Sequence, residues 1–174
     1  ALNNLGNVIL QLNRPKEALG YFQKAIKIEP NYAEPYYNIG AIYETLGNKK
    51  EALYNFQKAI KIKPDYAEVY NSIGLMFHEN MEFDQALSSY NKAIKLKPDY
   101  EKPYNNLGNL LNELGKHDEA TDKYYQAIKI KPNHAILYSN LLFNLSHKTN
   151  FDLDTYLSEL KKFRSNCKSI KKNL

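Results

Sequence analysis

The chain repeats itself at a constant interval of 34 residues. Glycine, alanine and proline mark the period at four positions of each copy. These positions hold Gly6, Gly40, Gly74 and Gly108; Ala18, Ala52, Ala86 and Ala120; Ala25, Ala59, Ala93 and Ala127; and Pro30, Pro64, Pro98 and Pro132. No residue is inserted or deleted between copies, so each copy is one structural unit stacked on the last. Because a stacked repeat presents a long surface to partners, the period favours recognition as the function.

Each copy has the pattern of two amphipathic helices. In the second copy, a first helix is predicted over residues 33–46 and a second over residues 50–62. The inward face of the first helix is formed by Tyr36, Ile39, Gly40 and Tyr43. Pro64 ends the second helix, because proline cannot donate a backbone hydrogen bond and restricts the residue before it.

Glycine is expected where the first helix ends, since it adopts the left-handed C-cap conformation at little cost. Gly47 and Gly115 occupy this position, and Asn13 fills it in the first copy. Met81 departs from the pattern in the third copy.

Four copies resemble the tetratricopeptide repeat, over residues 1–32, 33–66, 67–100 and 101–134. They share its order of an aromatic residue, Leu/Ile-Gly, Ala, Phe/Tyr, Ala and Pro at the family's spacing. The resemblance implies an all-α fold, a right-handed superhelical solenoid of helix-turn-helix units. Residues 135–174 are expected to form a divergent fifth repeat, or capping helices, that end in a basic tail.

The net charge of +5 is unevenly distributed. The last fourteen residues hold six cations and no acids, which leaves −1 for the first 160 residues; these cations are Lys161, Lys162, Arg164, Lys168, Lys171 and Lys172. Arginines and aromatics are not interleaved on one exposed face, so a nucleic-acid partner is not expected. No apolar run reaches the length of about 20 residues needed for a membrane span.

No catalytic, cofactor-binding or metal-binding set is recognised. The four histidines are spread over residues 78–147, and Cys167 is the single cysteine, so neither a disulfide framework nor a thiol metal site is predicted. A reducing cytosol fits this composition, and we expect a cytoplasmic protein. This part of the chain is not expected to be an enzyme.

Small polar residues recur on the first helices, opposite the packed face. One column reads Asn4, Asn38, Ser72, Asn106, Asn140 and forms an asparagine ladder with one serine. Asparagine both donates and accepts, so a column of asparagines can bind the backbone of an extended peptide. The predicted peptide-binding residues on this concave face are Asn4, Asn7, Tyr37, Asn38, Asn71, Ser72, Asn105, Asn106, Asn109 and Asn140. The alternative is that asparagine is merely tolerated on an open face.

The C-terminal segment adds a second resemblance. Residues Ser139–Phe143 and Asp154–Phe163 are similar to the junction after the repeats in bacterial proteins like O-linked N-acetylglucosamine transferase. In that family, an asparagine ladder holds protein substrates and a glycosyltransferase domain follows. Asp152 or Asp154 is expected to cap the last helix, with Tyr156, Leu157, Leu160 and Phe163 on its packed face. An ordinary capping helix is the alternative.

These observations predict a protein-interaction module that binds an extended peptide segment of another protein. The family resemblance implies the substrate-recruiting arm of a larger protein, and a catalytic domain is expected to follow there. The alternative is a structural scaffold that self-associates through the ends of its solenoid, because a helix face is left open at Ala1.

Overall fold

The computed structural model describes residues 1–148 and 150–172, with side chains up to residue 165. All regular structure within these residues is α-helical, which confirms the all-α repeat fold. The chain divides into two compact units, Ala1–Met76 and Phe77–Leu174. The cations beyond residue 165, together with Cys167, lie outside the described side chains.

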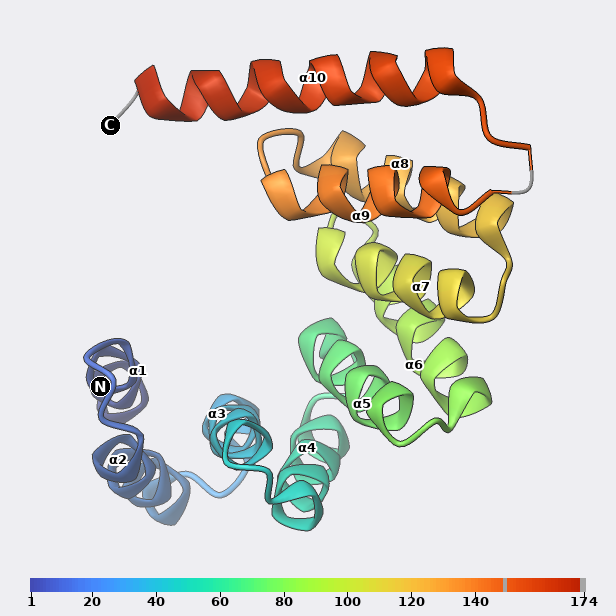
Figure 1. The fold of residues 1–174 in the computed structure, drawn as a ribbon. Coiled ribbons are helices and arrows are strands. Elements are labelled where there is room, and N and C mark those ends of the chain that lie inside the picture. The colour runs from blue at the N-terminus through green and yellow to red at the C-terminus, as the bar shows by residue number, and fades with distance from the viewer. Residues whose placement is uncertain (149, 173–174) are drawn as a thin grey trace. The chain divides into compact units, whose positions relative to one another are not determined.

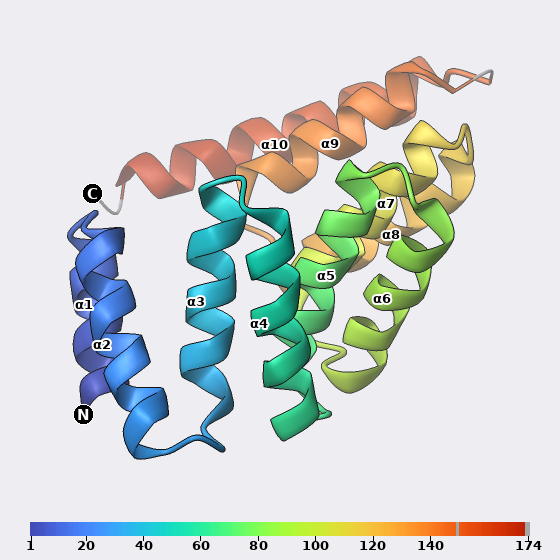
Figure 2. The same cartoon turned by 90° about the horizontal axis from the view of Figure 1, so that it is seen from below.

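Ten helices occur within the described residues, and they alternate as the first and second helices of successive repeats (Figures 1 and 2). They are α1 Leu2–Gln11, α2 Pro15–Ile28, α3 Ala33–Thr45, α4 Lys49–Ile62, α5 Ala67–Glu79, α6 Phe83–Leu96, α7 Glu101–Glu113, α8 His117–Ile130, α9 Ala135–Ser146 and α10 Leu153–Lys172. In the first unit, α3 packs against α2 and α4. In the second unit, α7 packs against α6 and α8, and α9 packs against α8 and α10.

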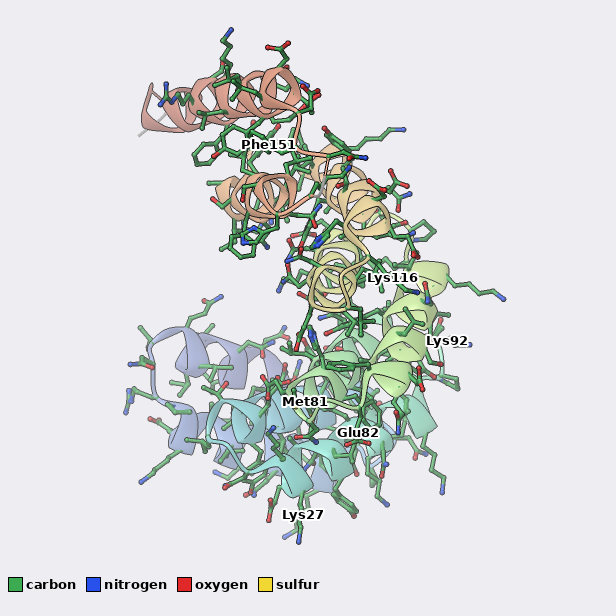
Figure 3. The ribbon with its side chains drawn as sticks, turned by 45° about the vertical axis from the view of Figure 1, so that its right-hand side comes forward. Lys27, Met81, Glu82, Lys92, Lys116 and Phe151 are labelled. Carbon is green, nitrogen blue, oxygen red and sulfur yellow. The ribbon has the colours of Figure 1, made fainter. Side chains whose placement is uncertain are left out.

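The four turns that end α1, α3, α5 and α7 share one backbone conformation. Gly47 and Gly115 have φ angles of 76° and 73°, and Asn13 has a φ angle of 57°. Met81 takes the same left-handed conformation, with a φ angle of 61°, although it has a bulky side chain (Figure 3). The stacking geometry therefore imposes this turn even where the residue disfavours it.

The repeat glycine lets the two helices of a copy approach closely. In three copies, a Cβ atom on this glycine would lie 2.5–2.7 Å from an aromatic ring of the second helix. These pairs are Gly6 with Phe22, Gly40 with Phe56, and Gly108 with Tyr124. The ring thus fills the space that the missing side chain leaves, and it is buried in each case.

The last helix begins as expected but buries a different face. Asp152 caps α10, since its carboxylate accepts hydrogen bonds from the backbone nitrogens of Asp154 at 3.1 Å and Thr155 at 3.3 Å. The prediction that Leu157 packs inward is wrong, because its side chain is 41% exposed. Glu159 is buried instead, where it accepts a hydrogen bond from Tyr125 at 3.3 Å and pairs with Lys162 at 2.7 Å. Tyr156 and Phe163 pack against the rest of the unit as predicted.

None of the described helices is long and apolar enough to cross a membrane.

Candidate functional site

Two members of the asparagine ladder, Asn38 and Asn140, donate hydrogen bonds to asparagines outside the ladder on the first helix of the preceding repeat. In the first unit, the Nδ2 group of Asn38 on α3 donates to Oδ1 of Asn3 at 3.0 Å and to Oδ1 of Asn7 at 2.9 Å. Both acceptors lie on α1, so Asn38 joins the first helices of two repeats. These bonds use both hydrogens of the Asn38 amide.

The second unit repeats one of these bonds. The Nδ2 group of Asn140 on α9 donates to Oδ1 of Asn105 on α7 at 2.8 Å. Asn38 and Asn140 hold the same place in their repeats, as do Asn3 and Asn105. The ladder therefore has a structural part in both units.

Asn3 lies beneath this face. Its side chain is 2% exposed, and its Nδ2 group donates to the Tyr32 hydroxyl at 3.2 Å and to Glu34 at 3.0 Å. Glu34 also accepts from the Tyr32 hydroxyl, and this bond is the main reason why the pKa of Tyr32 is raised. Asn3, which accepts from Asn38, is thus held in place by the Tyr32 hydroxyl and the Glu34 carboxylate.

Two predicted ligand-facing residues are buried, and their placement on an open face is wrong. Asn71 is 7% exposed and Ser72 is 8% exposed. Ser72 forms a hydrogen bond with Tyr37. Their side chains lie within the first unit and contribute little surface to a partner.

Tyr37 belongs to an aromatic cluster rather than to the ladder. Its ring lies 5.9 Å from that of Phe56 and 5.3 Å from that of Tyr66. Burial raises the pKa of Tyr37, and the Glu68 and Glu44 carboxylates add to the shift. Burial likewise raises the pKa of Tyr66, with Glu34 as the next cause. Both tyrosines therefore stay protonated at neutral pH and can present hydroxyl groups.

The remaining predicted residues differ in exposure. Asn4 is exposed on α1, whereas Asn7, Asn105, Asn106, Asn109 and Asn140 are half-buried. Asn109 accepts a hydrogen bond from the Tyr124 hydroxyl at 2.9 Å. The structure thus brings Asn7 and Asn38 together in the first unit, and Asn105 and Asn140 together in the second.

A polar cluster that the sequence analysis missed joins α7, α8 and α9. Asn144 is fully buried and donates to Thr121 Oγ1 at 2.8 Å and to the His117 carbonyl at 2.9 Å. His117 Nδ1 lies 2.9 Å from Asn112 Oδ1 and 3.2 Å from Asn144 Oδ1. The position of Asn144 within the repeat could have indicated this cluster. Asn144 occupies the slot that holds Ile42 in the second repeat, and a polar residue in a core slot requires a partner.

No group of three histidine, cysteine, aspartate or glutamate side chains that could hold a metal ion occurs among the described residues.

Family comparisons agree with the repeat spacing. Models described as tetratricopeptide repeat match residues 1–65 and 102–134, and one described as TPR repeat matches residues 76–115. The chain is built of tetratricopeptide repeats. Proteins built of this repeat generally serve as modules for protein–protein interaction. Among curated proteins, none matches the chain.

Several solved structures share the fold. MamA from Desulfovibrio magneticus RS-1 is 21% identical with a TM-score of 0.77, and the match covers 97% of this chain and 94% of that one. PilF of Pseudomonas aeruginosa is 19% identical with a TM-score of 0.84, over 95% and 74%. YrrB, a TPR protein with an unusual peptide-binding site, is 23% identical with a TM-score of 0.68, over 95% and 84%. At these identities, the likeness establishes the fold.

Proposed function

We propose that this tetratricopeptide repeat protein holds an extended segment of a partner protein on the face formed by the first helices. The pair Asn7–Asn38 carries this proposal. Within the described residues, the Nδ2 group of Asn7 and the Oδ1 atom of Asn38 take part in no hydrogen bond. A donor and an acceptor thus lie side by side in a fixed orientation, which matches the carbonyl and amide of a peptide backbone.

The hydrogen bonds that hold Asn38 also favour binding of a peptide backbone. A free asparagine side chain loses rotational freedom when it binds a ligand, and that loss opposes binding. Because Asn38 is already held by Asn3 and Asn7, its outward acceptor is oriented before a partner arrives. Peptide binding by YrrB, which has the same fold, supports the same class of ligand.

Asn7→Asp tests the proposal without disturbing the structural bond. Aspartate keeps the oxygen that accepts from Asn38 but replaces the outward amide donor with a carboxylate oxygen. We expect affinity for a library of extended peptides to fall about tenfold or more, while the melting temperature stays unchanged. Asn91→Asp, an exposed residue on α6, makes the same charge change away from the site and serves as the control. Equal peptide binding by both variants would refute the role of this pair.

We further propose that the chain is the substrate-recruiting arm of a larger protein similar to O-linked N-acetylglucosamine transferase. The similarity of residues Ser139–Phe143 and Asp154–Phe163 to that family's junction supports this context. The gene sequence after codon 174 tests it directly. A following glycosyltransferase domain is the expected result, and an unrelated domain there removes this context while leaving the peptide site in place. The cysteine content leads us to place the protein in a reducing cytosol.

Self-association through the ends of the repeat array is the second candidate, and the exposure of α1 favours it. Leu5 is 41% exposed and Val8 is 51% exposed. The equivalent positions in the later repeats are at most 6% exposed: Ile39, Ile73, Leu107 and Leu141 for Leu5, and Ile42, Met76, Leu110 and Asn144 for Val8. At the other end, Leu153 of α10 is 57% exposed. Each end thus offers apolar surface to a neighbouring copy.

Sedimentation at increasing protein concentration distinguishes this candidate from a monomeric peptide-binding module. Self-association predicts a mass that rises with concentration and returns to the monomer value in a Leu5→Gln/Val8→Gln variant. Leu46→Gln is the matched control, because this position is exposed within the array as well. A constant monomer mass for the unmodified protein excludes the scaffold.

A further inference from the structure

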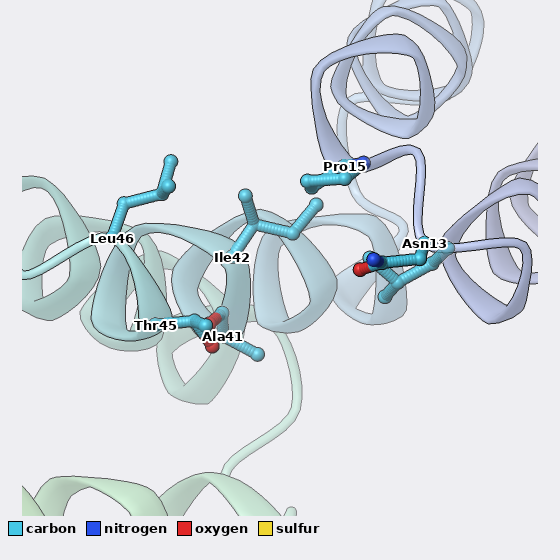
Figure 4. Close-up of a pocket in the computed structure, with 7 residues that line it drawn as sticks. Asn13, Pro15, Ala41, Ile42, Thr45 and Leu46 are labelled. Carbon is cyan, nitrogen blue, oxygen red and sulfur yellow. Dashed lines mark hydrogen bonds between the residues drawn. The ribbon is translucent and has the colours of Figure 1, made fainter.

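An apolar pocket of about 240 Å³ lies in the first unit, where the turn between α1 and α2 meets the C-terminal half of α3 (Figure 4). Its aliphatic lining residues are Leu10, Pro15, Ala41, Ile42 and Leu46. Asn13 and Thr45 complete the lining, and Thr45 Oγ1 donates to the Ala41 carbonyl at 2.9 Å. No charged side chain is among these residues.

The repeat supplies an internal comparison for this pocket. Two repeats further on, His78 and Glu113 occupy the places of Leu10 and Thr45. There, His78 Nε2 lies 2.8 Å from Glu113 Oε2, so a polar bridge spans the corresponding space. Phe83 stands in place of Pro15, and its ring lies 6.0 Å from that of His78.

The last junction is closed in a different way. One repeat later still, His117 takes the place of Pro15 and Asn144 that of Ile42. These two side chains join Asn112 in the buried polar cluster described above. The first junction is therefore unlike both junctions of the second unit, because small or aliphatic residues leave its space open.

The size and chemistry of the pocket identify its occupant. Pockets that bind small molecules usually measure about 300–1,000 Å³, and this pocket is smaller. An uncharged lining gives no compensation for burying an ion, so a lysine or glutamate side chain is disfavoured. One aliphatic side chain of leucine or methionine size fits both constraints.

The pocket is also continuous with the proposed peptide site. Ala41 follows Asn38 by three residues on α3, and Leu10 follows Asn7 by three residues on α1. One helical turn rises about 5.4 Å, so the pocket lies about one turn from the Asn7–Asn38 pair. A peptide backbone that is held by the two amides can therefore direct a side chain into the pocket.

We propose that this pocket is a specificity site that takes one aliphatic side chain of the bound peptide. The proposal rests on the peptide-binding function inferred above, and it adds a sequence preference to a site that otherwise contacts only backbone. Partners are then selected by a leucine or methionine at one position of an extended segment. At the two internal junctions of the second unit, the His78–Glu113 bridge and the His117–Asn144 contact hold the corresponding places, so we assign the preference to the first unit.

The test uses N-acetyl-leucinamide and N-acetyl-serinamide as probes on the whole protein, with methyl NMR of Ile42 and Leu46. Leucinamide at millimolar concentration should shift both methyl signals in a saturable way, with about tenfold higher affinity than serinamide. Ala41→Leu should abolish these shifts, because the larger side chain fills the pocket. The next repeat already has a leucine, Leu75, at the equivalent position. Ala41→Ser keeps the pocket open and should retain them.

Paired peptides that differ by leucine or serine at one position form the second arm. The leucine peptide should bind about tenfold more tightly, and Ala41→Leu should remove this difference. The proposal is overturned if leucinamide leaves Ile42 unshifted, or if Ala41→Leu responds like the unmodified protein. If leucinamide occupies the pocket but no peptide binds, the pocket assignment stands and the peptide-binding function falls.

Discussion

At the scale of single residues, Met81 is the clearest conflict between local preference and fold. Its φ angle of 61° places a non-glycine residue in the left-handed region, and its side chain is 71% exposed. Left-handed backbone costs an ordinary residue about 1–2 kcal/mol, and here little side-chain burial offsets that cost. We expect Met81→Gly to stabilise the second unit by about 1 kcal/mol, measured by chemical unfolding.

The same turn in the first unit provides the reverse experiment. Gly47→Ala forces a side chain onto a φ angle of 76° and should destabilise by a similar amount. No atom lies within 4 Å of a Cβ atom built at Gly47, so steric contact does not confuse the result. If Met81→Gly instead lowers stability, then side-chain contacts of Met81 outweigh its backbone strain.

Asn38 has a structural role that the sequence analysis did not predict. Its two hydrogen bonds join α1 and α3, so it is a structural group as well as a candidate ligand. We expect Asn38→Ala to lower the free energy of unfolding by about 1–3 kcal/mol, from two bonds of about 0.5–1.5 kcal/mol each. Asn4→Ala changes an exposed residue of the same column, and it should stay within about 0.5 kcal/mol. Equal effects would show that the bonds of Asn38 add nothing to stability.

The sequence predicted which residues share a face but not how their amides are oriented. A period of 34 places Asn4, Asn38 and Asn140 in one column without any knowledge of the helix crossing. The choice of Asn3 as acceptor, and the burial of Asn71 and Ser72, depend on how closely neighbouring first helices approach. That distance is set by packing across the whole repeat, which no local pattern records.

At the scale of helices, the glycine and proline positions predicted most helix ends and most helix pairings. They did not predict the polar contacts between α8 and α9. In the repeat before it, the corresponding positions are Leu87 and Leu110, an apolar pair. In the last junction both positions become polar, and Asn144 Nδ2 donates to Thr121 Oγ1 at 2.8 Å. This hydrogen bond makes α9 specific for α8. If α9 packed against the second helix of another repeat, Asn144 would be buried without a hydrogen bond to a threonine hydroxyl.

A double-mutant cycle tests this specificity. Thr121→Leu alone should destabilise the second unit by about 1–3 kcal/mol, because it leaves the Asn144 amide short of an acceptor in the core. Adding Asn144→Leu should recover most of that loss, since it restores the apolar pair of the preceding junction. The coupling energy from urea unfolding should lie between about 0.5 and 3 kcal/mol. Additive effects of the two substitutions would mean that the hydroxyl and the amide stabilise the helices independently.

At the scale of the whole molecule, charge separates the repeats from the C-terminal segment. The repeats are close to neutral, whereas the last fourteen residues carry six cations. Polyanions bind lysine and arginine clusters through counterion release, so affinity falls steeply with salt. Any binding of single-stranded nucleic acid by this protein should therefore come from the C-terminal segment and be nonspecific, with a Kd of about 10⁻⁴–10⁻⁶ M at physiological salt.

Variants with neutral side chains test which residues bind single-stranded nucleic acid. Replacing Lys161, Arg164, Lys168, Lys171 and Lys172 by glutamine should abolish binding of an oligothymidylate and flatten its salt dependence, while peptide binding is unchanged. Lys162 is kept because it pairs with the buried Glu159.

The matched control replaces five lysines of the second helices: Lys24, Lys58, Lys61, Lys92 and Lys95. These lysines are distributed over three second helices, whose first turns carry Glu17, Glu51 and Asp84, so the control should retain oligothymidylate binding. If the control loses as much affinity as the C-terminal variant, the second helices form a polyanion surface and the prediction that the repeats avoid nucleic acid is wrong.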